Sequence, residues 1–228
     1  MYSGTTPIEI VDSAKCLGLH IDKSLTWSTH IDKISHKFSG KLKKLYPLRS
    51  CSRKILATIY FQGILPSVLY GIQIWGNCAP NLLNNVEKIH CRAARFICGV
   101  KRNVPDHHVL SVCNWKSISH YYKISIACKT FKILNKMSTP RLNDLVRVNP
   151  FQRTRNYQGL IIPSFKYMFF KHSFQYRASK IWNNIPKDIK EKPSVKSFKT
   201  ALRKSNVLEK INFNAVGLAL NYESFIYY

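Results

Sequence analysis

Apolar residues recur at helical spacing through the first half of the chain. Between 27 and 45 they follow one another in steps of three and four, which puts them on one stripe of a helix: Trp27, Ile31, Ile34, Phe38, Leu42 and Leu45. A second stripe runs through 82–96 and stops before Gly99, a residue suited to the end of a helix. The pattern therefore predicts two long amphipathic helices.

Two further segments are apolar without being amphipathic. Residues 118–135 carry apolar side chains on several sides of a helix, which predicts deep burial. The segment 55–75 has no charged residue, so its length would allow a bilayer span. Gly63, Pro66 and Gly71 interrupt it, however, and favour two buried helical segments that meet at a kink. We keep the membrane helix as the less favoured alternative and expect no membrane partner.

Alternation of period two marks the short strands. Leu17, Leu19 and Ile21 lie on one side of 15–22, which predicts a half-buried strand in a short hairpin. Prolines and asparagines in 137–155 predict a linker. After it, 157–162 and 166–170 are predicted to be strands.

The last predicted elements are two helices. One covers 174–182 and ends near Pro186, and the other starts at a cap provided by Ser194. Together, the elements predict a mainly α chain, in which a helical bundle follows a short β-hairpin and precedes a small mixed α/β module.

The charge of the chain indicates what kind of partner it binds. The chain has 36 Lys and Arg against 11 Asp and Glu, a net charge of +25. Phosphate backbones are the commonest partner for such an excess, because neutralising them releases their counterions. The alternative is a basic protein without such a partner. Seven cysteines with no C-x-x-C pair, and no secretory pattern near the start, predict a nuclear or cytoplasmic location.

The cations gather on the two amphipathic helices. On the first, Lys33, Lys37 and Lys44 lie roughly 120° from the apolar stripe. On the second, a group of three lies opposite the apolar face: Lys88, Arg92 and Arg95. One such stripe is usually a solvated surface, but two of the same sign with few acids nearby favour a track for phosphates.

Catalytic chemistry is not indicated. Two-metal phosphoryl transfer needs clustered carboxylates, and the 11 acids include no Asp-Asp pair and no pair on one helix face near a plausible pocket. We therefore expect no enzyme activity and no cofactor. Cys91, Cys98, His107 and Cys113 suggest zinc, but the gap of six residues between the first two cysteines favours buried core cysteines over a zinc site.

The order of short motifs along 11–204 resembles the carboxy-terminal part of reverse transcriptases from LINE-type, non-long-terminal-repeat retrotransposons. The segments that carry the resemblance are Lys15-Cys16-Leu17-Gly18, Leu25-Thr26-Trp27, His30-Ile31, Leu65-Pro66, Tyr70-Gly71, Trp75-Gly76, Arg92-Ala93-Ala94-Arg95, Phe131-Lys132-Ile133-Leu134-Asn135, Trp182-Asn183-Asn184-Ile185-Pro186 and Ser197-Phe198-Lys199. Cys16 stands where that family usually has tyrosine.

The resemblance implies a division of the chain. Residues 1–25 would be a palm-edge hairpin, 26–136 a thumb-like helical domain, 137–206 a C-terminal module and 207–228 a weakly patterned tail. The family's palm carboxylates and its aromatic-x-Asp-Asp box are absent from this sequence.

The implied role is a non-catalytic grip on the backbone of an RNA and DNA template–primer duplex. The implied partners are that duplex and the upstream palm of the same polyprotein. Tyr157, Phe165 and Tyr167 are candidates for base stacking, although core positions are favoured. A truncated element product without independent function stays open, and a membrane or zinc-binding protein is the less favoured reading.

Overall fold

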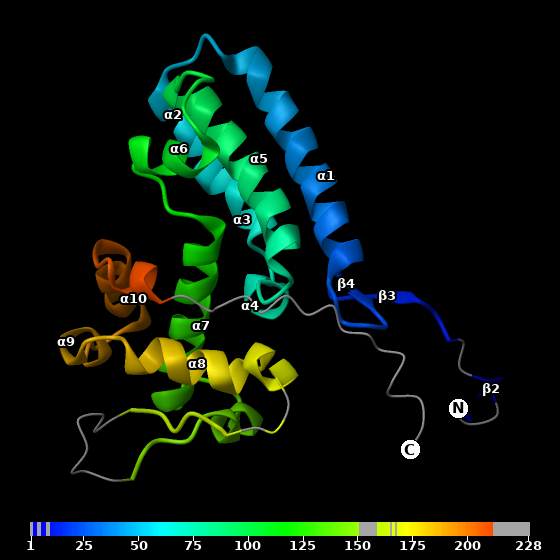
Figure 1. Ribbon diagram of the computed structural model, residues 1–228, viewed down its shortest axis with the longest axis vertical. Coiled ribbons are helices and arrows are strands. Elements are labelled where there is room, and N and C mark those ends of the chain that lie inside the picture. Colours follow the sequence, from blue (N-terminus) through cyan, green and yellow to red (C-terminus); the bar gives the residue numbers. More distant parts are fainter. Residues whose placement is uncertain are drawn as a thin grey trace. The chain divides into compact units, whose positions relative to one another are not determined.

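The chain is mainly α-helical, as predicted, in a computed structural model that describes residues 2–3, 6–7, 10–150, 159–164, 166 and 168–211 (Figure 1). Contacts divide the described residues into two units. Unit 1 comprises 2–71 and 78–115, and unit 2 comprises 72–77 and 116–211. The grouping puts 118–135 with the elements that follow it, whereas the resemblance implies a boundary after 136. The predicted domains themselves stay a prediction.

Unit 1 contains a hairpin and the two amphipathic helices. Its strands and α-helices are β1 (Tyr2–Ser3), β2 (Thr6–Pro7), β3 (Ser13–Cys16), β4 (Leu19–Asp22), α1 (Ser28–Leu45), α2 (Arg53–Ile59), α3 (Leu65–Val68), α5 (Pro80–Cys98) and α6 (Asp106–Val112). A 3₁₀ turn covers Tyr46–Leu48. β1 pairs with β2 and β3 pairs with β4, both antiparallel.

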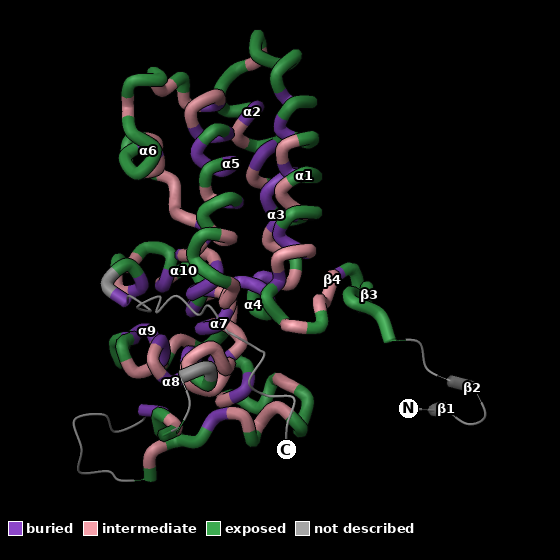
Figure 2. Tube along the Cα trace, turned by 45° about the vertical axis from the view of Figure 1, so that its right-hand side comes forward, coloured by how far each residue is buried: buried purple, intermediate pink, exposed green. Residues whose placement is uncertain are grey.

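The two predicted amphipathic helices are confirmed, and α1 packs beside α5 (Figure 1). α1 starts where the Asp22 carboxylate accepts hydrogen bonds from the backbone N–H of Thr26 at 2.8 Å and of Trp27 at 2.7 Å. α5 ends at Gly99, whose φ of 69° is left-handed as predicted. Burial alternates with exposure along both helices (Figure 2).

The core of unit 1 is aromatic. Tyr60 is fully buried and stacks on Trp115 with ring centroids 5.0 Å apart, and it also stacks on Phe38 at 6.3 Å. Its hydroxyl is hydrogen-bonded to Nδ1 of the buried His90. Tyr60 begins a π-helical turn, Tyr60–Ile64, between α2 and α3.

This turn lies in the uncharged segment 55–75, which is divided into short helical segments, so the predicted interruption is confirmed. The predicted burial is confirmed only in part, because Leu56 and Tyr60 are buried whereas Ile55, Ile59 and Ile74 are exposed. In the part of the chain that the structure describes, every helix is too short or too polar to cross a bilayer.

The hairpin differs from the predicted alternation. The chain reverses at Leu17 and Gly18, both with positive φ, so Leu17 lies at the tip and is 85% exposed instead of half-buried. Leu19 is buried and packs against Gly71, where an added Cβ would lie 2.8 Å from a Leu19 methyl carbon. The tip was predicted wrongly because period-two alternation does not show where a strand turns back.

Unit 2 forms around one central helix. Its α-helices are α4 (Ile72–Trp75), α7 (Ile118–Leu134), α8 (Phe174–Asn183), α9 (Lys187–Lys190) and α10 (Val195–Lys204). Its 3₁₀ turns are Pro140–Leu145, Met168–His172 and Val207–Lys210. α7 contacts α4, α8 and α10, which explains its apolar residues on several sides and confirms its predicted burial.

The two predicted C-terminal helices are confirmed as α8 and α10, and Ser194 and Ser197 form a capping box at the start of α10. The predicted strand at 166–170 is wrong where it overlaps the 3₁₀ turn Met168–His172. Of the strand predicted at 157–162, the described part forms a single bridge between Leu160 and Val148. Tyr157, Phe165 and Tyr167 lie outside the described residues, as does the tail from 212 onward.

Candidate nucleic-acid interface

The outward side of α1 is a row of lysines. Lys33, Lys37 and Lys44 are exposed, and the opposite side of the helix is buried through Ile31, Phe38 and other apolar residues. Among the described residues, the structure forms no salt bridge between these three lysines and a carboxylate. We call this set, Lys33, Lys37 and Lys44, the α1 outer face. It is a surface of unneutralised positive charge on a rigid helix.

The α1 outer face continues onto the hairpin. Lys33 Nζ lies 3.1 Å from His20 Nδ1 on β4, and Lys15 on β3 is the cross-strand partner of His20. Burial first, and then the charges of Lys33, Lys15 and Lys37, lower the pKa of His20. The contributions of the three lysines show that cations of the hairpin and of the start of α1 lie close to His20.

Lys88 and Arg92 face a different space. They line a groove of about 500 Å³ between α1 and α5, together with polar residues of α1 and one acid of α6. Its other lining residues are Asp32, Ser35, His36, Ser39, Asn85, Ile89 and Asp106. Arg92 Nη2 donates a long hydrogen bond of 3.5 Å to Ser39 Oγ across this groove. The groove brings together Asp32 and Asp106, two acids far apart in the sequence whose convergence was not predicted.

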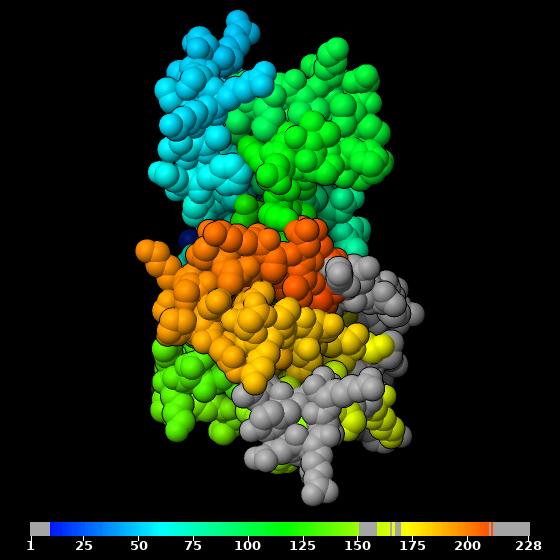
Figure 3. All heavy atoms as spheres, turned by 90° about the vertical axis from the view of Figure 1, so that its left-hand side faces the viewer, coloured from blue at the N-terminus to red at the C-terminus, as the bar shows by residue number. Residues whose placement is uncertain are grey.

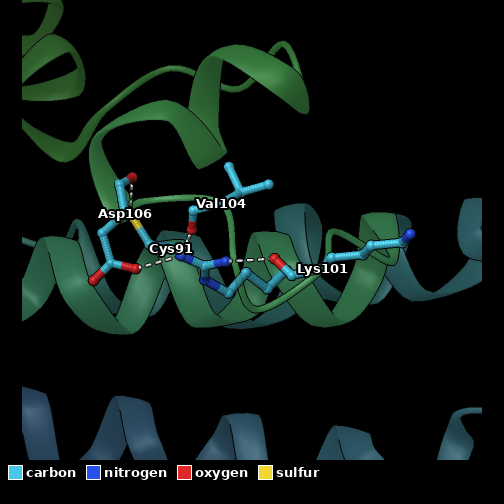
Figure 4. A network of polar contacts seen from close by, with 5 residues as sticks. Cys91, Lys101, Val104 and Asp106 are labelled. Carbon is cyan, nitrogen blue, oxygen red and sulfur yellow. Dashed lines mark hydrogen bonds and ion pairs between the residues drawn. The ribbon is translucent and has the colours of Figure 1, made fainter.

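The side chain of Arg95 is engaged in contacts within unit 1. Its guanidinium donates to the backbone carbonyl oxygens of Lys101, at 2.9 Å, and Val104, and forms a 2.7 Å ion pair with Asp106 (Figure 4). Its side chain is only 17% exposed. These bonds tie the loop after α5 and the first residue of α6 to the helix. Arg95 thus has a positioning role in unit 1, and its predicted contact with phosphate is not tested.

The six predicted residues therefore lie in three places. The α1 outer face holds Lys33, Lys37 and Lys44, whereas the groove holds Lys88 and Arg92. The part of α1 that lines the groove is roughly 130° around the helix from the lysine row, at 100° per residue. Arg95 is in a third place, beneath the loop. Binding of phosphate by these six residues stays a prediction.

Three contributors to this surface were not predicted. Lys41 is exposed and follows Lys37 by four residues, so the i, i+4 spacing alone could have identified it; its Nζ donates to Ser67 Oγ at 2.7 Å. Lys15 and His20 could have been found from the hairpin register once the turn was placed at Leu17 and Gly18.

Cys91, Cys98 and Cys113 lie near one another in unit 1. Cys91 Sγ donates to the Asp106 carbonyl oxygen at 3.6 Å, and burial raises its pKa to about 11. Burial and a hydrogen bond with Cys98 raise the pKa of Cys113 to about 12. His107 is exposed on α6. Within the described ranges, no three His, Cys, Asp or Glu side chains are placed to hold a metal ion.

Comparison with known proteins gives relatives of one kind. Over 175 residues, the chain is 27% identical to "Probable RNA-directed DNA polymerase from transposon X-element" of Drosophila melanogaster, covering 68% of this chain and 19% of the relative. It is 34% identical to the corresponding protein of transposon BS of the same species, covering 41% and 12%. It is 30% identical to that of the mobile element jockey of Drosophila funebris, covering 37% and 10%.

The chain thus spans about a fifth or less of the length of these relatives. No protein-family model matches the chain. No solved structure matches it either.

Proposed function

The chain is a homologue of part of the RNA-directed DNA polymerases of retrotransposons, and from this we propose that unit 1 holds the backbone of a template–primer duplex. The α1 outer face is the contact surface. In this proposal the polymerase carboxylates lie elsewhere in the longer protein, and this chain is a non-catalytic part of it.

The observation that carries the proposal is the unneutralised lysine row. Like charges at i, i+4 spacing destabilise a helix, so a row of them without carboxylate partners is costly unless an anion neutralises it. A surface that must follow any sequence needs contacts with phosphates and not with bases, and lysine on a rigid helix provides such contacts. Lys15 and His20 extend the row onto the hairpin.

The groove residues Lys88 and Arg92 support the same role from the other side of α1. Both are exposed and reach the groove next to the hydroxyl of Ser39. Two acids line this groove, so its net positive charge is smaller than that of the α1 outer face. We therefore assign the larger share of the duplex affinity to the α1 outer face.

The test compares two triple variants of the full chain with the same loss of charge. K33Q/K37Q/K44Q neutralises the α1 outer face. K54Q/K101Q/R102Q neutralises three exposed cations of unit 1 outside that face and outside the groove. Affinity for a short RNA–DNA hybrid duplex is measured at one salt concentration. The first variant is expected to bind about 10- to 100-fold more weakly and the second nearly as wild type.

Equal losses in the two variants would contradict the proposal, because they would show that net charge alone sets the affinity. No loss in either would contradict it as well.

The upstream palm is the second partner in this proposal, because the start of the chain exposes apolar side chains. Ile10 is 93% exposed, Leu17 at the hairpin tip 85% and Leu25 63%. Exposed apolar side chains grouped near one element mark an interface in many proteins. Replacing Leu17 and Leu25 by serine should weaken association with the separately produced palm and leave duplex affinity unchanged. Unchanged association would rule out the hairpin as the contact.

A further inference from the structure

A second group of cations lies on unit 2, on helix α10. Lys196, Lys199 and Arg203 are exposed and fall within about 60° of one another around the helix, over roughly 10 Å of its length. The opposite side of α10 is buried through Phe198 and Leu202, both 0% exposed. The helix contains no acidic residue. Its charged side chains are therefore all cationic.

Helix α7 adds a cation to the same surface. α7 and α10 are joined by Phe131 and Phe198, whose rings stack with centroids 4.5 Å apart. Next to this contact is the half-buried thiol of Cys128: burial raises its pKa, while Lys199, Lys132 and Arg203 act to lower it. Three cations from two helices thus lie close enough to influence one sulfur atom.

These cations are not neutralised by a carboxylate of the described residues. Within the described ranges, Lys132, Lys196, Lys199 and Arg203 form no salt bridge, whereas Lys116 of the same unit pairs with Glu209. The segment that contains α9 and α10, coloured orange, is open to solvent over a broad area in the space-filling view (Figure 3).

We propose that Lys132, Lys196, Lys199 and Arg203, here called the α10 face, form a second binding site for the phosphate backbone of a nucleic-acid duplex. This goes beyond the proposed function, which rests on unit 1 alone and shares none of these residues. The two surfaces lie on different units, so each makes its own contribution to affinity.

The chemistry of the face selects this ligand among polyanions. A helix that binds a membrane surface inserts its apolar side, but Phe198 and Leu202 are already fully used in the core of unit 2. Single strands are held by stacking on exposed aromatics, and the sole aromatic residue of α10 is the buried Phe198. Cations at helical spacing without stacking groups fit a duplex backbone.

The test again uses paired variants of the full chain. K132Q/K199Q/R203Q removes three of the four charges of the α10 face and keeps Lys196, and K136Q/R141Q/R147Q removes the same charge from exposed positions after α7. Affinity for a short RNA–DNA hybrid duplex is measured between about 50 and 200 mM salt. In the first variant, the magnitude of the negative slope of log affinity against log salt should decrease by about 3, and in the control by less than about 1.

Three outcomes would overturn the proposal. The first two are an unchanged slope in the α10-face variant and an equal change in the control. The third comes from binding of the same proteins to vesicles of anionic phospholipid: the α10-face variant loses vesicle binding and keeps wild-type affinity for the duplex. Failure of the proposed function is distinguishable, because K33Q/K37Q/K44Q would then have no effect while the α10-face variant still lowers the slope.

A second measurement on the wild-type chain avoids any dependence on how the variants fold. Lysines are acetylated with and without the duplex, and the modified sites are found by mass spectrometry. Lys132, Lys196 and Lys199 should be protected at least about threefold, and the exposed Lys136 should not, because bound phosphates cover amines only where they contact them. Equal modification of all four with duplex bound would contradict the α10 face.

Discussion

Helices α1 and α7 are nearly equal in length, 18 and 17 residues, and both carry several lysines, but Lys37 of α1 and Lys123 of α7 have opposite roles. On α1, Lys37 and its neighbours face solvent and have no carboxylate partner among the described residues. On α7, Lys123 is 8% exposed, and its Nζ donates to the Leu208 carbonyl oxygen at 3.0 Å. Burial lowers the pKa of Lys123.

The difference separates cations that hold the fold from cations that are free to bind a ligand. Residue type alone does not make this distinction, because both helices contain lysines; the spacing of the apolar residues around each helix does. Position on the helix makes it: α1 is covered on one side, whereas α7 is covered on several. A lysine therefore signals binding only where the fold leaves it exposed.

The largest expected effect comes from exchanging these two lysines for alanine. Lys123→Ala removes the donor to a buried carbonyl group and leaves a cavity, so the free energy of unfolding should fall by about 3 kcal/mol. Lys37→Ala should change it by less than about 0.5 kcal/mol, because that side chain is exposed. Urea titrations followed by circular dichroism measure both. Similar changes in the free energy of unfolding for the two variants would contradict the difference between a structural and an exposed lysine.

The next largest effect on stability distinguishes Arg92 from Arg95, which lie on the same predicted polar side of one helix. Arg95→Gln should lower the free energy of unfolding by about 2 kcal/mol, because two carbonyl oxygens and Asp106 lose a charged donor. Arg92→Gln should leave stability within about 0.5 kcal/mol and weaken duplex affinity instead. Thermal unfolding and duplex titration of each variant give the two numbers. A large loss of stability in Arg92→Gln would show that the groove is structural.

A smaller effect depends on pH and concerns α7 again. His120 is 3% exposed, neither ring nitrogen has a hydrogen-bond partner among the described residues, and burial lowers its pKa from 6.5 to about 4. The unfolded chain then binds the proton more readily, so this contribution to stability is complete above pH 6.5 and is lost as the pH falls below it.

Between pH 7.5 and 5.5 the loss from His120 should be about 1.4 kcal/mol. His120→Phe should remove that part of the pH dependence and leave the rest. The measurement is the difference between the unfolding free energies of wild type and variant at the two pH values. An identical pH dependence in both would mean that His120 titrates normally in the folded chain.

Much of the fold could be predicted because the signals are local. Helices α1, α5, α7 and α10 follow from apolar spacing, and Gly99 and Ser194 mark their ends. The fold class and the likeness to retrotransposon polymerases were also readable from the sequence, and the relatives confirm the latter.

What could not be predicted depends on contacts between distant segments. The role of Arg95 is set by a loop that folds back over α5, and the groove exists only because α1 and α5 pack side by side. The exposed tip at Leu17 required the turn to be located, which alternation does not do. Base stacking by Tyr157, Phe165 and Tyr167 and the nuclear or cytoplasmic location stay predictions.

The central claim is that exposed lysines of α1 contact phosphates, and the salt dependence of duplex binding tests it most directly. Log affinity of the full chain for an RNA–DNA hybrid is plotted against log salt for wild type, K33Q/K37Q/K44Q and the control K54Q/K101Q/R102Q. Each phosphate contact adds about 0.9 to the magnitude of the negative slope. The magnitude should therefore decrease by about 3 in the α1 variant and by less than about 1 in the control. Identical slopes in all three proteins would contradict the account.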